Sequence, residues 1–262
     1  VRIWSDDRDM ARDYLLVANL ATLLWLGQQA ALEFHVWFSR LAAAPDGRRL
    51  PTTYAASSEA LDRSRLNFPD FLVFDLDSYD YSGKEVKGAE PELNRRGFGR
   101  VRTVAREVRE MADSLGLSAF VKTSGRTGLH LYIPILRRFP FEEARAMAEA
   151  IGRRLAADRP KEVTLEWSVK SRTGKVFFDY NQNVRGKSLA AAYSPRRHPQ
   201  ATVSTPVTWD ELDDLFPTDF TMRTVPERLA REGDPWEGLL DAKADLGAAL
   251  RRTAAAEMVE VS

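Results

Sequence analysis

The feature that most constrains this chain is an apolar stretch, FLVFDLD, which runs from residue 71 to residue 77 and carries two aspartates at its end. Residues 71–74 have the continuous apolar character of a strand that is buried on both faces. Side chains alternate along a strand, so Asp75 and Asp77 share one face while Leu76 points to the other. Two carboxylates that close repel each other unless a cation lies between them. The alternative interpretation is a strand end, where the aspartates reach solvent or cap the following turn.

Composition indicates an ordinary globular protein, because the 262 residues are 44% hydrophobic. Basic and acidic residues each number 38, so a polyanion site has to be a local patch. The absence of cysteine excludes disulfides, thiolate zinc sites and cysteine nucleophiles, and it fits a cytoplasmic protein. The most apolar segment, residues 15–27, is too short and too interrupted to span a bilayer. We therefore expect neither a membrane partner nor a signal peptide.

Hydrophobic periodicity and turn residues predict one α+β domain over residues 1–262, with a mixed or antiparallel sheet flanked by helices. A largely buried helix is expected at 9–29, and a loop begins with APDGRRLP at 44–51. Further helices are expected at 91–115, at 141–157 and in a helical C-terminal segment at 208–262, where Thr208 with Glu211 and Thr224 with Glu227 form capping-box patterns. Strands are expected at 31–38, 71–77, 118–123, 129–135, 163–169 and 175–180.

A third aspartate, Asp179, ends the apolar run at 176–178 in the same way. Three carboxylates on adjacent strands would hold two hard divalent cations about 3.5–4 Å apart, as in phosphoryl-transfer sites. Residues 168–198 contain only this one acid and seven basic residues, which are Lys170, Arg172, Lys175, Arg185, Lys187, Arg196 and Arg197. In a neutral chain this pattern predicts a local polyanion site. The alternative is a basic surface loop.

A short polar turn, SGRTG at residues 124–128, separates two expected strands. Its backbone N–H groups can approach an oxyanion, and glycine permits the dihedral angles that this requires. A tight hairpin needs the same residues, so the turn alone does not specify a phosphate site. The three histidines of the chain, His35, His130 and His198, lie in or beside these elements. A packed core histidine is the alternative for each of them.

In combination, FDLD, SGRTGLH and FFDYNQNVRGKSLAAAYSPR resemble the motifs of the polymerase domain of bacterial DNA ligase D and its stand-alone relatives. These proteins belong to the archaeo-eukaryotic primase superfamily. The similarity covers residues 1 to about 242, with the three motifs in the order and spacing of the family. It implies a primase-like catalytic core around a mixed sheet with an RRM-like element.

The resemblance also implies a function, a template-directed nucleotidyltransferase of non-homologous end joining that fills gaps and extends ends at double-strand breaks. The family prefers ribonucleotides, accepts deoxyribonucleoside triphosphates, and uses two divalent ions, Mn²⁺ or Mg²⁺. Its partners are DNA ends or gapped DNA, Ku and an ATP-dependent DNA ligase. The implied location is cytoplasmic, with the nucleoid.

Site residues carry over by position. Asp75, Asp77 and Asp179 match the family's metal-binding carboxylates. The positions that match residues beside the nucleotide and its triphosphate are His35, Ser124, Gly125, Arg126, Thr127, His130, Gln182, Asn183, Arg185, Lys187 and Arg196.

The chain departs from the family pattern at several positions. Ser78 and Val36 replace prolines, and Arg126 and Thr127 stand where many relatives have glycine or lysine. The basic and aromatic positions that hold the downstream 5′-phosphate and stack on the template in relatives are not found, so we expect the chain to lack the family's N-terminal portion. Two other functions stay open: a non-catalytic DNA-end-binding module of the same fold, and a metal-dependent nuclease, because acidic clusters on strands also serve hydrolysis.

Overall fold

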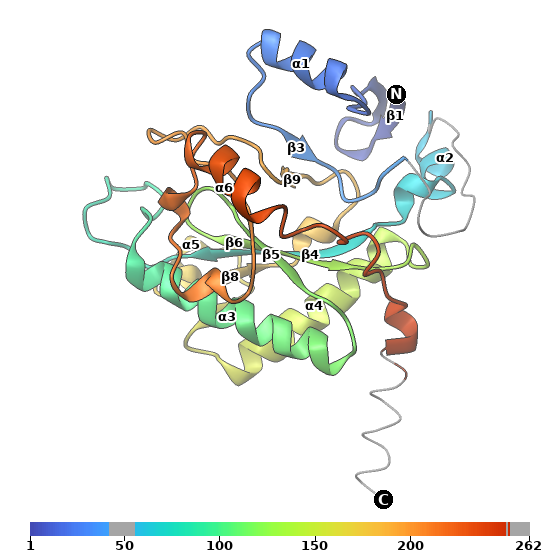
Figure 1. Cartoon of the computed structure of the whole chain (residues 1–262). Coiled ribbons are helices and arrows are strands. Elements are labelled where there is room, and N and C mark those ends of the chain that lie inside the picture. Colours follow the sequence, from blue (N-terminus) through green and yellow to red (C-terminus); the bar gives the residue numbers. More distant parts are fainter. Residues whose placement is uncertain (42–55, 250, 252–262) are drawn as a thin grey trace, which may run out of the picture.

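A six-stranded sheet with the strand order β10-β5-β6-β4-β8-β7 forms the centre of the computed structural model, which describes residues 1–41, 56–249 and 251 (Figure 1). Neighbouring strands are antiparallel, except that β7 and β8 run parallel. The strands are β4 (Phe71–Ser78), β5 (Phe120–Thr123), β6 (Leu129–Pro134), β7 (Val163–Thr164), β8 (Val176–Asp179) and β10 (Pro206–Val207). The predicted α+β fold with a mixed sheet is confirmed.

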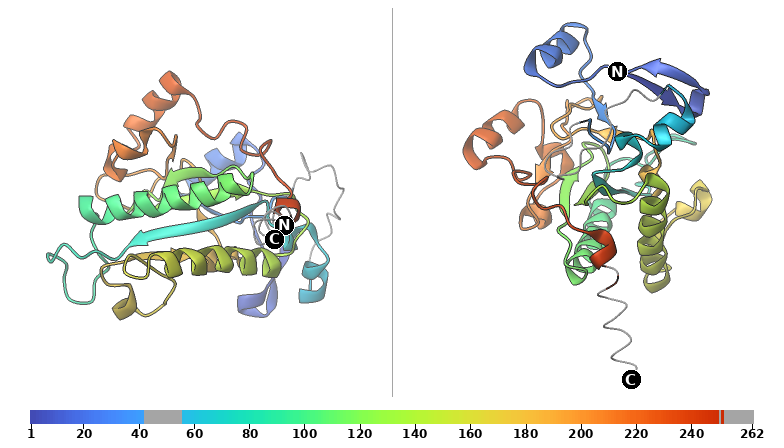
Figure 2. Two further views of the ribbon diagram at one scale, coloured as in Figure 1. Left: turned by 90° about the horizontal axis from the view of Figure 1, so that it is seen from below. Right: turned by 90° about the vertical axis from the view of Figure 1, so that its right-hand side faces the viewer.

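Two long helices, α3 (Arg95–Ser114) and α4 (Phe141–Asp158), cover one face of this sheet (Figure 2). The β4 side chains on that face, Leu72, Phe74 and Leu76, are fully buried and belong to the main core with apolar residues of both helices. The predicted helix at 91–115 begins at residue 95, because the Asn94 side chain accepts a hydrogen bond from the Gly97 N–H at 2.8 Å and caps the helix.

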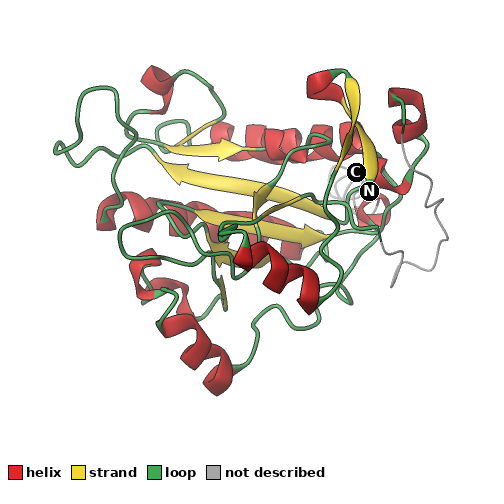
Figure 3. Cartoon of the chain, turned by 90° about the horizontal axis from the view of Figure 1, so that it is seen from above, coloured by secondary structure: helices red, strands yellow, loops and turns green. Residues whose placement is uncertain are grey.

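The opposite face of the sheet carries the N-terminal region, α6 and a smaller core that includes Phe38, Val73 and Tyr132 (Figures 1 and 3). The N-terminal elements are the hairpin β1 (Arg2–Ser5) and β2 (Met10–Asp13), helix α1 (Leu20–Gln28), β3 (His35–Val36) and α2 (Ser58–Asp62). β3 pairs with β9 (Leu189–Ala190). The remaining elements are α5 (Val169–Arg172), α6 (Thr224–Glu232) and short 3₁₀ helices at Asp6–Arg8, Arg65–Asn67, Asn181–Asn183, Glu211–Asp213 and Pro217–Asp219.

The prediction of one largely buried helix at 9–29 is wrong. Residues Met10–Asp13 form β2, and the Asn19 side chain caps α1, which therefore begins at Leu20. None of the nine residues of α1 is buried, and Leu20 and Leu24 are 68% and 60% exposed. Apolar composition predicts burial only where another element covers the helix, and no element in the described part of the chain does so here.

Other boundaries also differ from prediction. The strand expected at 31–38 shortens to His35–Val36, because its partner β9 has only two residues. The strand expected at 163–169 ends at Thr164, since the Glu166 N–H and C=O bond to Thr164 Oγ1 and Arg172 Nε rather than to a neighbouring strand. The loop predicted from residue 44 lies outside the described residues.

In the C-terminal segment, the first capping box forms, with hydrogen bonds between Thr208 and Glu211 in both directions. The second does not, because Thr224 is the first residue of α6 and its hydroxyl donates to the Asp219 carbonyl at 2.7 Å. Most of the described segment is turns, 3₁₀ helix and irregular structure rather than α-helix. Residues 250 and 252–262 lie outside the described residues. Among the described helices, none is both long and apolar enough to cross a bilayer.

Candidate functional site

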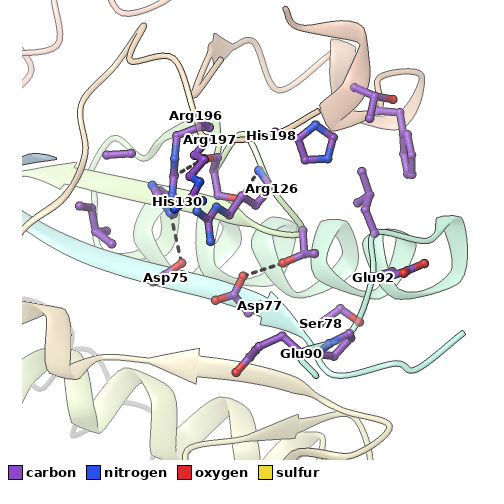
Figure 4. A pocket seen from close by; sticks show the side chains of 18 of the residues that line it. Asp75, Asp77, Ser78, Glu90, Glu92, Arg126, His130, Arg196, Arg197 and His198 are labelled. Atoms are coloured by element: carbon purple, nitrogen blue, oxygen red, sulfur yellow. Dashed lines mark hydrogen bonds and ion pairs between the residues drawn. The ribbon is translucent and has the colours of Figure 1, made fainter. Parts of the chain in front are cut away.

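A cleft of about 1050 Å³ opens over the end of β4, on the sheet face opposite the main core (Figure 4). The alternation of β4 sends Leu76 into the core and Asp75 and Asp77 into this cleft. Of the other predicted site residues, His35, Ser124, Arg126, Thr127, His130 and Arg196 also line it. The remaining polar lining comes from Ser78, Tyr79, Glu90, Glu92, Arg197, His198, Gln200 and Thr218.

Four polar side chains form one row across the sheet. On β4, Asp75 lies opposite His130 of β6 on one side and opposite Asp179 of β8 on the other. His130 in turn lies opposite Lys122 of β5. Directly opposed residues of antiparallel strands point to the same face. The row Lys122, His130, Asp75 and Asp179 is therefore fixed by strand register, although these residues are far apart in the sequence.

Each of the three aspartates faces a different neighbour. Asp75 Oδ1 is buried 3.3 Å from His130 Nε2, in an orientation that is not a hydrogen bond, and has no hydrogen-bond partner among the described residues. Asp77 Oδ1 accepts a hydrogen bond from Thr127 Oγ1 at 3.2 Å. Asp179 accepts hydrogen bonds from the Asn181 N–H at 2.8 Å and from Gln182 Nε2 at 2.9 Å.

Burial and mutual repulsion destabilise the charged forms of these carboxylates. Burial, with a further contribution from the charge of Asp75, raises the pKa of Asp179 to about 6. Burial also raises the pKa of Asp75, against the lowering effect of Lys122 and Arg196. For Asp77, burial and the charge of Asp75 both raise the pKa above its usual value of 3.8. A group of carboxylates with these shifts is stabilised by a cation that approaches from the cleft.

The donor chemistry of this group fits hard divalent cations such as Mg²⁺ and Mn²⁺, which prefer carboxylate oxygens. The unpartnered Asp75 Oδ1 is the observation that favours such a ligand, because a buried oxygen without a partner is costly. In the described part of the chain, no three aspartate, glutamate or histidine side chains converge on one point, since the carboxylates turn toward different partners. The fit thus rests on donor type, shared face and electrostatics.

Arginine and histidine side chains gather on the other side of the cleft. Figure 4 shows Arg126, His130, Arg196 and Arg197 facing the end of β4 that carries Asp75 and Asp77. Arg196 is held there because its guanidinium donates to Glu33 Oε1 at 3.2 Å and to the Ser124 carbonyl at 2.5 Å. Burial would raise the pKa of Glu33, but hydrogen bonds from His35 and the Arg197 N–H and the charge of Arg196 lower it to about 2. Glu33 is therefore ionised and anchors this side.

His130 lies beside Asp75 and is also close to the basic residues Lys122 and Arg196. Burial and the charges of Lys122, Arg196 and His35 hold its pKa well below the usual value. The ring is therefore neutral at physiological pH, with one N–H donor and one acceptor nitrogen.

The 124–128 turn is organised differently from the expected phosphate-binding loop. The Ser124 hydroxyl accepts hydrogen bonds from the N–H groups of Arg126 and Gly128, both at 3.1 Å, so these two amides already have a partner. Glycine is required at 128 because an added Cβ would lie 2.0 Å from the Leu76 carbonyl oxygen. Gly125 adopts a positive φ of 73°. The turn thus presents the Arg126 and Thr127 side chains to the cleft.

Six predicted site residues do not line the cleft: Asp179, which lies beside Asp75 on the neighbouring strand, Gly125, and four residues after Asp179. Gln182 orients the Asp179 carboxylate. Asn183 is buried and bonds to both the N–H and the C=O of Val73, so its amide extends the hydrogen bonding of β4. Arg185 pairs with Asp6 and Asp62, and Lys187 is exposed.

The basic stretch is likewise dispersed. Among its seven cations only Arg196 and Arg197 line the cleft. Arg172 instead is buried 3.5 Å from the ring centroid of Phe177, and Lys175 donates to the Pro160 carbonyl. The seven cations from which a local polyanion site was predicted therefore lie in different parts of the structure, because strand β8 of the sheet separates them along the chain.

Sequence reasoning missed several residues of the site. Lys122 could have been identified from the sequence, because it is a charged residue inside an expected strand, as Asp75 and Asp77 are. Glu33 lies two residues before His35. Nothing in this spacing indicates that Glu33 anchors Arg196. Glu90 and Glu92 come from an irregular insert, and tertiary structure alone brings them to the cleft.

Comparison with known proteins identifies the family. Residues 1–236 match the family model described as the LigD primase-polymerase domain. The multifunctional non-homologous end joining DNA repair protein LigD of Mycobacterium tuberculosis is 35% identical over 239 residues, which are 91% of this chain and 28% of that protein. The bifunctional LigD of Bacillus subtilis is 30% identical over 230 residues, which are 87% of this chain and 32% of that protein. The chain thus spans about a third or less of these relatives.

A solved structure supports the same conclusion. The polymerase domain of Mycobacterium tuberculosis ligase D, solved in complex with DNA, matches with a TM-score of 0.72 and 32% identity, over 93% of this chain and 75% of that chain. The family model covers more than half of the sequence, and fold and sequence agree. This chain therefore belongs to the LigD primase-polymerase domain family.

Proposed function

We propose that this domain is a template-directed nucleotidyltransferase that adds nucleotides to 3′ ends during gap filling and end processing in non-homologous end joining. The observation that carries the proposal is the division of charge in the cleft, with the aspartates of β4 on one side and Arg126, Arg196 and Arg197 on the other. A metal-bound triphosphate has the complementary distribution, cations on one side and phosphate oxygens on the other. The family of the chain agrees with this chemistry.

Asp75, Asp77 and Asp179 would hold two divalent cations, Mn²⁺ or Mg²⁺. When bound, such cations activate the attacking 3′-hydroxyl and neutralise charge on the leaving pyrophosphate. The carboxylates are preorganised for this role because β4 and β8 place them on one face by register, and because Gln182 and the Asn181 N–H fix Asp179.

The remaining residues bind and orient the triphosphate. Arg196 is anchored by Glu33 and Ser124, so its charge is held in place before the nucleotide arrives. Arg126 and Thr127 reach the cleft from the tight turn that Gly128 permits. Fixed donors of this kind stabilise charge that develops in the transition state and keep the α-phosphorus in line with the attacking oxygen.

The substrates and partners of the proposal follow the family. They are ribonucleoside triphosphates in preference to deoxyribonucleoside triphosphates, DNA ends or gapped DNA, Ku and an ATP-dependent DNA ligase, in the cytoplasm with the nucleoid. The support is that the relatives are named as non-homologous end joining proteins and that the matching solved domain was bound to DNA.

The test is extension of a labelled primer on gapped DNA that carries a downstream 5′-phosphate. Wild type and Asp75→Asn are compared in Mn²⁺ with ribo- and deoxyribonucleotides, and Asp214→Asn, an exposed acid outside the cleft, is the matched control. Extension by wild type and the control only, stronger with ribonucleotides, is expected.

Two results contradict the proposal. Shortening of the primer that depends on Asp75 would indicate a nuclease. Binding of gapped DNA with no extension by any form would indicate a non-catalytic end-binding module.

A further inference from the structure

A fully buried lysine lies in the middle of the sheet. Lys122 of β5 is 0% exposed, although its neighbour in the row, His130, lines the cleft. A lysine at such a position requires hydrogen-bond partners, because a buried amine or ammonium group without them is costly. Its two partners are Ser204 Oγ and His130 Nδ1.

The hydroxyl of Ser204 fixes the direction of the first contact. Ser204 Oγ donates its single hydrogen to the Thr123 carbonyl at 2.8 Å. The same oxygen must therefore act as the acceptor toward Lys122, whose Nζ is the donor. Lys122 is thus held at both its backbone and its head group, and its remaining N–H groups have a defined direction.

The second contact determines the state of the imidazole. Lys122 Nζ lies 2.8 Å from His130 Nδ1. Burial lowers the pKa of Lys122 well below its usual value, but even the neutral amine has two N–H groups, one for Ser204 and one for Nδ1. The carboxylate oxygen of Asp75, 3.3 Å from Nε2, favours a proton on that nitrogen rather than on Nδ1. In a neutral ring Nδ1 then accepts, and the ring proton resides on Nε2, the nitrogen that faces Asp75 and the cleft. We propose that Lys122 is a positioning residue, which fixes His130 in the Nε2–H tautomer so that the ring presents a hydrogen-bond donor to the cleft.

If the cleft binds a triphosphate, as the proposed function requires, the tautomer decides whether His130 can contact it. An Nε2–H group donates to a phosphate oxygen, whereas an unprotonated Nε2 repels it through its lone pair. Without Lys122, both tautomers become accessible, and only one of them binds an anion. Lys122 in this way sets His130 to bind an anionic ligand.

The chain allows a direct test, because it contains only three histidines. Long-range ¹⁵N–¹H spectra of the metal-free, ¹⁵N-histidine-labelled chain show whether each ring nitrogen is pyridine-like or pyrrole-like. The signals that are missing from a His130→Gln sample are those of His130. A pyridine-like Nδ1 and a pyrrole-like Nε2 are expected for His130. The reverse pattern in the wild type would by itself overturn the proposal, whatever the behaviour of the variants.

Lys122→Met tests the cause, since methionine fills a similar space without a donor. Lys243→Met is the matched control, because the side chain of Lys243 is only 2% exposed and pairs with Asp70 away from the cleft. The expected result is a mixed or reversed tautomer of His130 in Lys122→Met and an unchanged pattern in the control. An unchanged pattern in folded Lys122→Met would contradict the proposal.

Kinetics separate this inference from the proposed function. Nucleotide KM is expected to rise about tenfold in Lys122→Met, equivalent to about 1.4 kcal/mol of binding, with a smaller change in kcat. If wild type does not extend primers at all, the proposed function fails while the tautomer assignment still stands on the spectra. If extension is normal but the tautomer is reversed, only the positioning role fails.

Discussion

Asp75 and Asp179 lie directly opposite each other on β4 and β8, so two carboxylates from segments about a hundred residues apart are side by side on one face of the sheet. Neither aspartate is stabilised by an adjacent arginine or lysine of its own strand. Strand register therefore creates an electrostatic penalty, which a bound cation would relieve. The first prediction measures that penalty.

In the metal-free protein, Asp77→Asn is expected to raise the melting temperature at pH 8 and to leave it nearly unchanged at pH 4. The pKa of Asp77 is raised in the folded state, so the stabilising protonated form is complete below the usual pKa of 3.8 and is lost as pH rises through the raised value. Asparagine keeps the acceptor for Thr127 and removes the charge. Because Asp77 is only partly buried, we expect a gain of about 1 kcal/mol, or about 2–4 °C.

The measurement is thermal unfolding in EDTA at several pH values. Asp214→Asn, which removes an exposed charge outside the cleft, is the control and should show no pH-dependent gain. A lower melting temperature for Asp77→Asn at pH 8 would show that the carboxylates are not in mutual repulsion.

Gly128→Ala is expected to destabilise the domain by roughly 3 kcal/mol or more. The added methyl group would lie 2.0 Å from the Leu76 carbonyl oxygen and 2.6 Å from Asp77 Oδ1, so β4 and the turn would have to separate. Gly99→Ala, in the second turn of α3, is the control, since its nearest neighbour is a flexible Arg102 side-chain atom at 3.9 Å. It should be neutral or stabilising. Equal stability of the two variants in chemical denaturation would contradict the close approach.

Arg196→Lys is expected to raise nucleotide KM about tenfold, with a smaller effect on kcat. Lysine keeps the charge but cannot reach Glu33 and the Ser124 carbonyl together, so the triphosphate loses an oriented donor. Arg63→Lys, at the exposed position that follows α2, serves as the control. Steady-state extension kinetics give both parameters, and an unchanged KM would exclude Arg196 from triphosphate binding.

Arg185→Ala is expected to lower stability while leaving nucleotide KM unchanged. The family resemblance places Arg185 beside the nucleotide, but here its guanidinium pairs with Asp6 and Asp62 and joins the N-terminal region to the segment after β8. Melting temperature and KM, measured on the same preparation, distinguish the two roles. A higher KM at unchanged stability would favour the nucleotide role instead.

Much of the fold was predictable because the sheet strands are strongly patterned. FLVFDLD specifies a buried strand and places both aspartates on one face, and the structure confirms this with β4. The long helices α3 and α4 were also found at nearly the predicted positions. Helix α1 shows the limit, because its leucines predict burial whereas no described element covers them. Hydrophobicity specifies a preference for burial, but tertiary structure decides whether a partner is present.

The site was predictable in its residue types and less so in its contacts. Asp75 and His130 were identified from sequence, yet their adjacency depends on the register between β4 and β6. Asn183 looks like a ligand in sequence, but its amide serves the backbone of Val73. Local patterns report which side chains are unusual, whereas the pairing of distant strands decides which of them meet.

The central claim is that the two sides of the cleft bind a divalent cation and a triphosphate together. The most direct test is a titration with Mn²⁺, followed by electron paramagnetic resonance, with and without a non-hydrolysable nucleoside triphosphate. Wild type and Asp214→Asn are expected to bind Mn²⁺ at least tenfold more tightly when the nucleotide is present, and Asp75→Asn and Asp179→Asn are expected to lose this gain. Equal Mn²⁺ affinity in wild type and both aspartate variants, or no effect of the nucleotide, would contradict the account.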